Sequence, residues 1–448
     1  MVAMLRRKKR LIATSVAAVL LCAGTITIGW LNPRLTRFVE SDQFRRELEK
    51  ETAKGLHFQD AHYAPIHRTG TWTAECADFT ADNGRKAMKK IDAHGITGSF
   101  NPWGIFRRLW QIDRLHIQSG EVGIQVYEPE PEPSPAKPWY AVFLPERVYL
   151  NRVESEPVDV TWRFREKRAG FFGTRLLITP HGRDFEYQAS GGELKMASLP
   201  ELSLRHTHLL ITKTLLELYQ LELQPSGQTR GSLRASGKAG TRDDRHIDFK
   251  FEIDRMPVAD WLPDTWAQHV NGVASGKVLW RGENPKLESA MGEANLRVVD
   301  GYIQHLPFLE KLATITGEKE LTHLRMDVCW AELEWHYPSI GIKGFTLEEN
   351  GKFRAEGEVA VQEGKLHGTI QLGVARRLLA WLPKPEEVFP REKGGYLWTA
   401  VHLSGTIKSP QQDLTPRIVE AIKESPTAAL SILFRQFGEW LKNASTRE

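Results

Sequence analysis

Few residues in this chain have the types and spacing that catalysis or metal binding requires. His206 and His208 are two residues apart and would lie on one face of a strand, where imidazoles can bind a metal ion. Two histidines without a further ligand are more typical of a polar surface. Asp243 and Asp244 fall in a polar turn, which indicates solvated charge. The G-x-S-x-G, H-E-x-x-H, P-loop and G-x-G-x-x-G motifs are absent, so we expect no enzyme, cofactor or metal site.

The cysteines and tryptophans give no stronger signal. Of the three cysteines, Cys22 lies in an apolar run, whereas Cys76 and Cys329 are far apart in the sequence. These two could pair in an oxidising compartment, but two buried free thiols are the preferred interpretation. Fourteen tryptophans could serve a glycan hydrolase as stacking platforms, yet no pair of carboxylates can be identified beside them. A hydrolase acting on glycans is therefore the weakest of the functions that we consider.

The charge is concentrated at the N-terminus. The chain has 448 residues and a formal net charge of +4, and residues 1–10 contain five basic and no acidic side chains. The rest of the chain therefore has a formal charge of −1. A nucleic-acid-binding surface needs a net basic patch, so this function class is disfavoured.

The basic segment 1–10 precedes an uncharged apolar run, residues 11–31. About 20 such residues span the hydrocarbon core of a bilayer, and the preceding positive charges predict a cytoplasmic N-terminus. Trp30 stands where an interfacial aromatic residue would stand. We therefore expect a retained transmembrane anchor, with everything after Asn32 on the far side of the membrane.

Three alternatives to the anchor remain open. A signal peptide could be cleaved near Ala23-Gly24-Thr25, although the apolar run continues past this point. A lipoprotein signal would need small residues before Cys22, where Leu20 and Leu21 stand instead. A buried soluble helix does not explain the basic block.

The remainder of the chain has the period-two alternation of β-strands. It is strict in Val158–Phe164, Ile247–Ile253, Phe353–Val361 and Leu366–Leu372, and less regular in Leu397–Ile407. Turn signals between these segments, such as Asn350-Gly351, predict long antiparallel meanders. Each strand would have one apolar face, which either a second sheet or lipid could cover. The pattern does not decide between the two.

Helices are expected to be few and short. Candidates are 41–54, which Ser41 or Asp42 can cap, and 212–220, 306–316 and 375–382. A turn at Ser119-Gly120 would separate strands 112–118 and 120–127. Alternating prolines in 128–138 predict an exposed linker or loop. A last, amphipathic helix would begin at Ser425-Pro426 and either pack over the sheet or contact a membrane or a partner through an apolar stripe. The stripe comprises Leu430, Leu433, Phe434, Phe437 and Trp440.

Several phrases of the sequence are similar to those of one protein family. They are Phe44–Gly55 after the anchor, Ile112–Ile124, Gly292–Ile303 and the closing phrase Leu403–Pro410. With these phrases the chain resembles the AsmA-like family of envelope proteins, which is related to TamB and to the bridge-like lipid-transfer proteins built from repeating β-grooves. The resemblance covers the first hundred residues and the last 180 or so.

The resemblance implies a mainly β fold: an elongated, curled antiparallel β-sheet that forms a groove, with few short helices. It further implies a single-pass protein of the bacterial inner membrane whose bulk lies in the periplasm. Its partner would be phospholipid, whose acyl chains the groove shields, and its role would be lipid transport or outer-membrane and envelope homeostasis. The groove candidates are inward-facing apolar residues of the alternating strands: Val160, Trp162, Phe249, Phe251, Val359, Ile370 and Val401.

The expected organisation follows from these segments. A cytoplasmic segment 1–10 and an anchor 11–31 precede a juxtamembrane helix and first β-segment over 32–127. The Pro-rich segment 128–138 leads into a central β-segment 139–270, an AsmA-like module 271–410 and C-terminal helices in 411–448. The rival hypothesis is a structural or assembly factor of the envelope, which would have a dry, packed β-core and act through protein partners.

Overall fold

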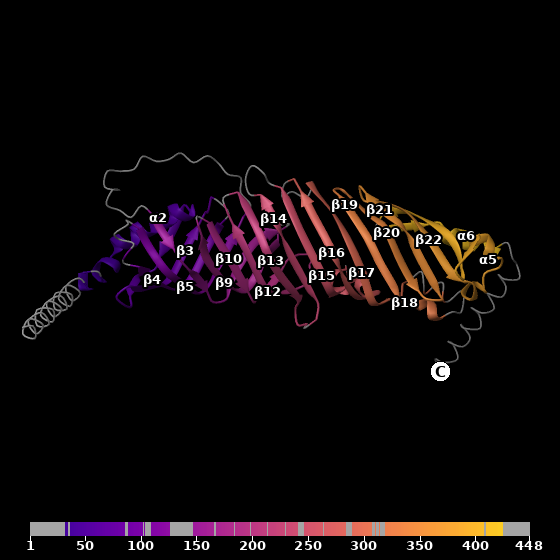
Figure 1. Cartoon of the computed structure of the whole chain (residues 1–448), viewed down its shortest axis with the longest axis horizontal. Helices are drawn as coiled ribbons and strands as arrows, with labels where there is room; N and C mark the ends of the chain where they lie inside the picture. Colours follow the sequence, from indigo (N-terminus) through magenta and orange to yellow (C-terminus); the bar gives the residue numbers. More distant parts are fainter. Residues whose placement is uncertain are drawn as a thin grey trace, which may run out of the picture. The chain divides into compact units, whose positions relative to one another are not determined.

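The computed structural model divides into two compact units, residues 1–194 and 195–448, and each is described by itself. Figure 1 labels the strands and helices along the chain. The structure describes residues 32–34, 36–85, 88–101, 103, 109–125, 147–164, 167–182, 184–197, 199–212, 214–228, 230–240, 246–262, 264–283, 289–306, 310, 313, 319–406 and 409–423. The fold is mainly β with few short helices, which confirms that part of the expected fold class.

The first unit begins with helix α2 (Asp42–Leu56), which packs on a sheet. Ser41 caps the helix by accepting a hydrogen bond from the Phe44 N–H at 3.2 Å, as the sequence predicts. Phe44 is buried with Phe58, Phe79 and neighbouring strand residues in the core of this unit. The strands are β1 (Asp60–Tyr63), β2 (Ile66–Arg68), β3 (Thr73–Asp82), β4 (Met88–Asn101), β5 (Leu109–Ile124), β6 (Arg147–Leu150), β7 (Val153–Ser155), β8 (Val158–Phe164), β9 (Lys167–His181), β10 (Asp184–Ser190) and β11 (Glu193–Lys195).

Strand β5 differs from the prediction in two ways. It runs through Ser119-Gly120 without a turn, because both residues pair with β4 on one edge and Gly120 also pairs with β8 on the other. In addition, β5 pairs in parallel with β6, β7 and β8, so the first unit is not a simple antiparallel meander. A parallel pair needs a long connection, and the 22 residues between Ile124 and Arg147 supply one.

The second unit is an antiparallel succession of long strands. Its strands are β12 (Leu202–Ile211), β13 (Leu215–Pro225), β14 (Ser232–Gly240), β15 (Ile247–Pro257), β16 (Val270–Gly282), β17 (Ala290–Gln304), β18 (His323–Met326), β19 (Val328–His336), β20 (Ser339–Glu349), β21 (Phe353–Gln362), β22 (Lys365–Ala375), β23 (Arg391–Lys393), β24 (Tyr396–Thr406) and β25 (Ser409–Gln412). Strands β12 to β17 pair in sequence order, β17 pairs with both β18 and β19, and pairing then continues through β22 to β24.

Two tight turns confirm the turn signals of the second unit. Gly351 has a φ of 74° in the β20–β21 hairpin. Glu363 and Gly364 both have positive φ and join β21 to β22 as a two-residue hairpin, the conformation that suits the twist of paired strands.

The predicted helices have mixed outcomes. The helix over 212–220 is wrong, because this segment enters strand β13, whose two edges pair with β12 and β14. Leucines and glutamates favour a helix locally, and the pairing of both strand edges overrides that preference. The 375–382 segment contains only the short 3₁₀ helix η6 (Arg376–Leu379). Of 306–316 the structure describes three residues, and the Glu310 N–H donates to the Leu306 carbonyl as in an α-helix.

Other short helical elements of the second unit are η3 (Ala259–Trp261), α3 (Asp264–Ala267), η5 (Lys319–Thr322), α5 (Pro385–Val388) and α6 (Leu414–Lys423). None of the helices within the described ranges has the length and apolar character needed to cross a membrane. The predicted anchor 11–31, the whole Pro-rich stretch 128–138 and the amphipathic segment 425–441 lie outside the described residues.

Candidate functional site

The second unit has an apolar row that crosses its whole sheet. Directly opposed residues of paired strands have side chains on the same face, so the strand register shows which residues share a face. Starting from Phe251, the register connects residues of which all but one are apolar or glycine. In strand order they are Thr207, Leu221, Ala235, Phe251, Val278, Ala294, Leu333, Ile342, Val359, Gly368 and Leu403.

Two further rows flank this one on the same face, because their members are mostly two residues away along each strand. One comprises Leu204, Leu223, Leu233, Ile253, Gly276, Leu296, Ala331, Phe345, Gly357, Ile370 and Val401. The other comprises Leu209, Leu218, Gly237, Phe249, Trp280, Gly292, Trp335, Ile340, Val361 and Leu366. Together the three rows form a continuous hydrocarbon surface, which we call the apolar face.

The opposite face of the same strands is charged. Lys238 and Glu217 form an ion pair of 2.8 Å between β14 and β13, and Lys277 lies 3.9 Å from Glu252 between β16 and β15. Such exposed cross-strand pairs add little stability, but they keep this face in water. The sheet therefore has one wet face and one apolar face, as the alternation predicts.

Several side chains of the apolar face are only partly covered. Phe249, Phe251 and Trp280 are half-buried and form an aromatic cluster whose ring centroids are 6.4 Å apart in the two pairs involving Phe249. Ile340, farther along the same face, is 53% exposed. A residue in the middle of a dry two-layer core would be close-packed on all sides. This face instead has room for a further apolar layer.

At the C-terminal end the apolar face leads into a cavity of about 400 Å³. Its floor is the sheet from β20 to β24, and its cover comes from η6, the segment beyond it, and α6. The lining residues are Ile303, Leu306, Leu324, Leu347, Phe353, Ala355, Ile370, Leu372, Val374, Leu378, Leu379, Trp381, Phe389, Val401, Leu403, Gln412, Leu414 and Ile418. Gln412 is the one polar residue of this lining, and no lining residue has an ionisable side chain.

The groove candidates therefore fall into distinct groups. Ile370 and Val401 are direct cross-strand partners and both line the cavity. Phe249, Phe251 and Val359 lie on the apolar face outside the cavity. All five share one face of one unit.

The other two candidates belong to the first unit. Val160 lies on β8 opposite Val122 of β5 and Phe171 of β9. Trp162 is two residues farther along the same strand and packs against Phe171 with ring centroids 5.8 Å apart. Neither residue lines the cavity.

The cover of the cavity was missed by the analysis of alternation. Leu378, Leu379, Trp381, Phe389, Leu414 and Ile418 lie in short helical or irregular segments, which have no strand period. The run Leu378–Leu382 between charged residues was the available signal, since a short apolar segment outside a strand needs a surface to cover.

Cys329 places a thiol on the apolar face. It lies opposite Leu347, and Leu347 in turn lies opposite Ala355 of the cavity lining. Burial raises the pKa of the Cys329 thiol above its ordinary value. Both cysteines are free in this structure; Cys76 is buried, as the preferred interpretation expects, whereas Cys329 is half-buried.

The candidate metal ligands do not converge. His206 and His208 lie on β12 opposite Glu222 and Gln220, on one face of the strand as expected. Within the described ranges, no three side chains of His, Cys, Asp or Glu are arranged to hold a metal ion.

In the comparisons with known proteins, no family model, no curated protein and no solved structure matches the chain.

Proposed function

We propose that this protein binds the acyl chains of phospholipids on the apolar face of its second unit. The observation that carries the proposal is the cavity of about 400 Å³, whose lining is apolar except for Gln412. Its size falls within the range of small-molecule sites, roughly 300 to 1,000 Å³. A hydrocarbon chain matches this lining because it needs no hydrogen-bond partner and no counter-charge.

The energetics favour an occupied site. Each buried methylene group gains about 0.8 kcal/mol, so a long acyl chain can be held without specific polar contacts. Water is a poor occupant because the wall offers it almost no polar partner.

The open part of the apolar face extends the binding surface. In the proposed arrangement the sheet curls into a groove, acyl chains lie along the rows containing Phe251 and Val359, and head groups stay in water. Half-buried side chains on these rows support this reading, since they are shielded from one side only. The charged opposite face would keep the protein soluble outside the membrane.

The cellular role in this proposal rests on the anchor and on the AsmA-like resemblance. Residues 11–31 would hold the chain in the inner membrane of a bacterium, with the N-terminus in the cytoplasm and the bulk in the periplasm. The protein would then contribute to lipid transport or to homeostasis of the outer membrane and envelope. It would work without a cofactor and without catalysis.

Photo-crosslinking of the full chain in cells tests the proposal. A benzophenone amino acid at Phe251 should yield a covalent phospholipid adduct, detected by mass spectrometry of the purified protein. The matched control carries the same group at Lys250, the adjacent exposed residue on the charged face. Adducts at 251 and not at 250 would support the groove. A folded protein that gives no lipid adduct at position 251, even when phospholipid is added, would refute the proposal.

A second function, a structural or assembly factor of the envelope, is favoured by one observation. Near the β12 end of the second unit Leu202, Leu204, Leu223 and Met256 are at most 2% exposed, as in a dry core. If this packing continued over the whole face in cells, the benzophenone at Phe251 would crosslink to protein and not to lipid.

A further inference from the structure

One arginine of the first unit joins the helical residues before α2 to the turn between β2 and β3. The guanidinium of Arg68, the last residue of β2, donates to the Asn32 carbonyl at 2.9 Å and to the Thr36 hydroxyl at 2.8 Å. Its other terminal nitrogen donates to the Thr71 carbonyl in the turn at 2.8 Å. Because a guanidinium is rigid and planar, it holds Asn32 and the turn beside each other. We call this arrangement the Arg68 clamp.

Two exposed tryptophans lie at the same end of the sheet. Trp72 ends the clamped turn and is 42% exposed, and its carbonyl accepts the Phe100 N–H of β4 at 2.7 Å. Trp103 follows shortly after β4, and its backbone N–H donates to the Asn101 side chain at 3.1 Å. Trp103 is 73% exposed, and no large apolar side chain within the described ranges is more exposed. Exposed aromatic side chains gathered at one end of a sheet indicate an interaction surface.

The helical segment that the clamp holds is basic. Residues 32–39 contain Arg34 and Arg37 and no acidic side chain, and both arginines are exposed. Arginine binds phosphate well, and tryptophan combines an apolar ring with one N–H donor, which suits the boundary between water and hydrocarbon. The chemistry of this end of the unit therefore matches phospholipid head groups.

The place of this end in the chain points to the same partner. The apolar run 11–31 stops directly before Asn32, so in the proposed anchor Asn32 is the residue that leaves the hydrocarbon core. The head-group layer beyond the core is roughly 5–8 Å thick on each side. Arg68 binds Asn32 and Thr71 through one guanidinium, so the turn lies close to the level at which the chain leaves the core.

We propose that this end of the first unit lies on the surface of the bilayer, with the indole rings of Trp72 and Trp103 in the head-group layer and the exposed arginines on lipid phosphates. This inference rests on the anchor 11–31 of the proposed function and adds how the first unit is seated on the membrane. Two tryptophans alone would bind a bilayer weakly. The anchor keeps them beside it at a high effective concentration, and the Arg68 clamp fixes their orientation.

The test uses the full chain in phospholipid nanodiscs. A naphthalene-based fluorescent amino acid replaces one residue at a time, and phosphatidylcholine with a doxyl group near its head group is the quencher. Asp82 is the matched control, because it is exposed and ends β3, whose ten residues place it roughly 33 Å from Trp72. The head-group layer is thin compared with that distance, so we expect quenching at positions 72 and 103 to exceed that at position 82 by about threefold or more.

Two arginine variants test the clamp. Arg68→Ala frees the turn from Asn32, so we expect it to lower quenching at positions 72 and 103 by about half. Arg85→Ala removes an exposed arginine beyond the opposite end of β3 and should leave quenching as in the wild type. Unchanged quenching in a folded Arg68→Ala variant would overturn the role of the clamp.

The same label at Trp30, in the apolar run, separates this inference from the proposed function. Quenching at position 30, with no more at positions 72 and 103 than at position 82, would overturn the membrane surface and leave the two tryptophans to a protein partner. A chain that is not quenched at position 30 would instead overturn the anchor, and the seating on the membrane with it.

Discussion

The indole ring of Trp335 on β19 lies over Gly292, its direct partner on β17. A Cβ atom at position 292 would lie 2.3 Å from Trp335 Cζ2 and 2.1 Å from the Leu279 carbonyl oxygen, far below any van der Waals contact. Glycine thus lets the ring lie against the sheet at the floor of the apolar face. The space above the ring is part of what the proposed ligand would occupy.

Replacing this glycine should therefore lower the stability of the second unit. For Gly292→Ala we expect a loss of about 1–3 kcal/mol in the free energy of unfolding, as in overpacked cores, measured by urea denaturation. Gly341→Ala on the next strand is the matched control, since its nearest neighbour would lie 3.9 Å away. Equal stability of the two variants would contradict the close approach of Trp335 to Gly292.

A charge placed in the cavity should prevent binding. Ile370→Lys puts an ammonium group among apolar side chains, whereas Gln371→Lys puts it on the opposite face beside Glu356. Burial of an unpaired charge is costly, so we expect Ile370→Lys to weaken binding of cis-parinaric acid, a naturally fluorescent fatty acid, by tenfold or more. Gln371→Lys should bind as the wild type does. Unchanged binding by a folded Ile370→Lys variant would place the ligand elsewhere.

The Cys329 thiol should report occupancy of the apolar face. A raised pKa leaves less thiolate at a given pH. The reaction of Cys329 with a maleimide should therefore accelerate at a higher pH than the reaction of a fully solvent-exposed cysteine. Bound phospholipid should slow the reaction further because it covers the half-buried thiol. Quantitative labelling of Cys329 against Cys76 by mass spectrometry measures this. A labelling rate that ignores added phospholipid would argue against a ligand near β19.

The edge of the first unit's sheet should depend on helix α2. The carboxylate of Glu49 accepts the Tyr63 N–H of β1 at 3.0 Å, so a helix side chain takes the place of a strand. Glu49→Ala should cost about 1–3 kcal/mol by leaving that donor without an acceptor. Glu47→Ala, at an exposed position of the same helix, should cost much less. Urea denaturation compares the two, and equal losses would show that Glu49 has no such role.

Alkaline pH should weaken the first unit through Tyr63. Burial raises the pKa of Tyr63 from 10.0 to about 12, so the folded protein keeps the proton that the unfolded chain loses. Stability is therefore fully present below pH 10 and falls between pH 10 and 12, by at most about 1.4 kcal/mol per pH unit. Tyr63→Phe should remove this part of the decline. An identical pH dependence of unfolding in the variant and the wild type would contradict it.

Local sequence determined most of the strands and their faces. Alternation in segments such as Ile247–Ile253 fixes which side chains share a face, because successive residues of a strand point to opposite sides. Ser41 determined the start of α2, and Asn350-Gly351 determined a hairpin, because caps and tight turns depend on a few adjacent residues. The apolar face could therefore be predicted, with Ile370 and Val401 on it.

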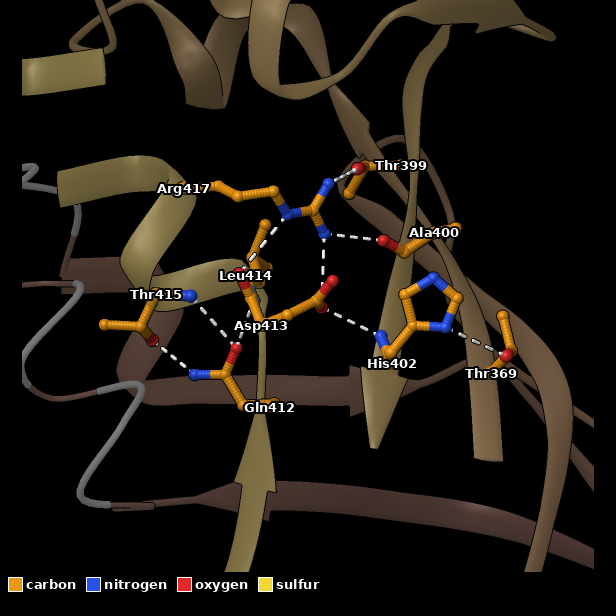
Figure 2. A network of polar contacts seen from close by, with 9 residues as sticks. All are labelled: Thr369, Thr399, Ala400, His402, Gln412, Asp413, Leu414, Thr415 and Arg417. Carbon is orange, nitrogen blue, oxygen red and sulfur yellow. Dashed lines mark hydrogen bonds and ion pairs between the residues drawn. The ribbon is translucent and has the colours of Figure 1, made fainter. Parts of the chain in front are cut away.

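Tertiary structure decided which segments pair as strands and which surfaces other elements cover. Ser119-Gly120 looks like a turn and Leu215–Gln220 like a helix, yet neighbouring strands on both edges hold each segment extended. The cavity likewise needs η6 and α6 to fold back onto the sheet that precedes them, where Arg417 of α6 donates a hydrogen bond to Thr399 of β24 (Figure 2). Such contacts depend on where the chain returns in space, which a local pattern of residues does not contain.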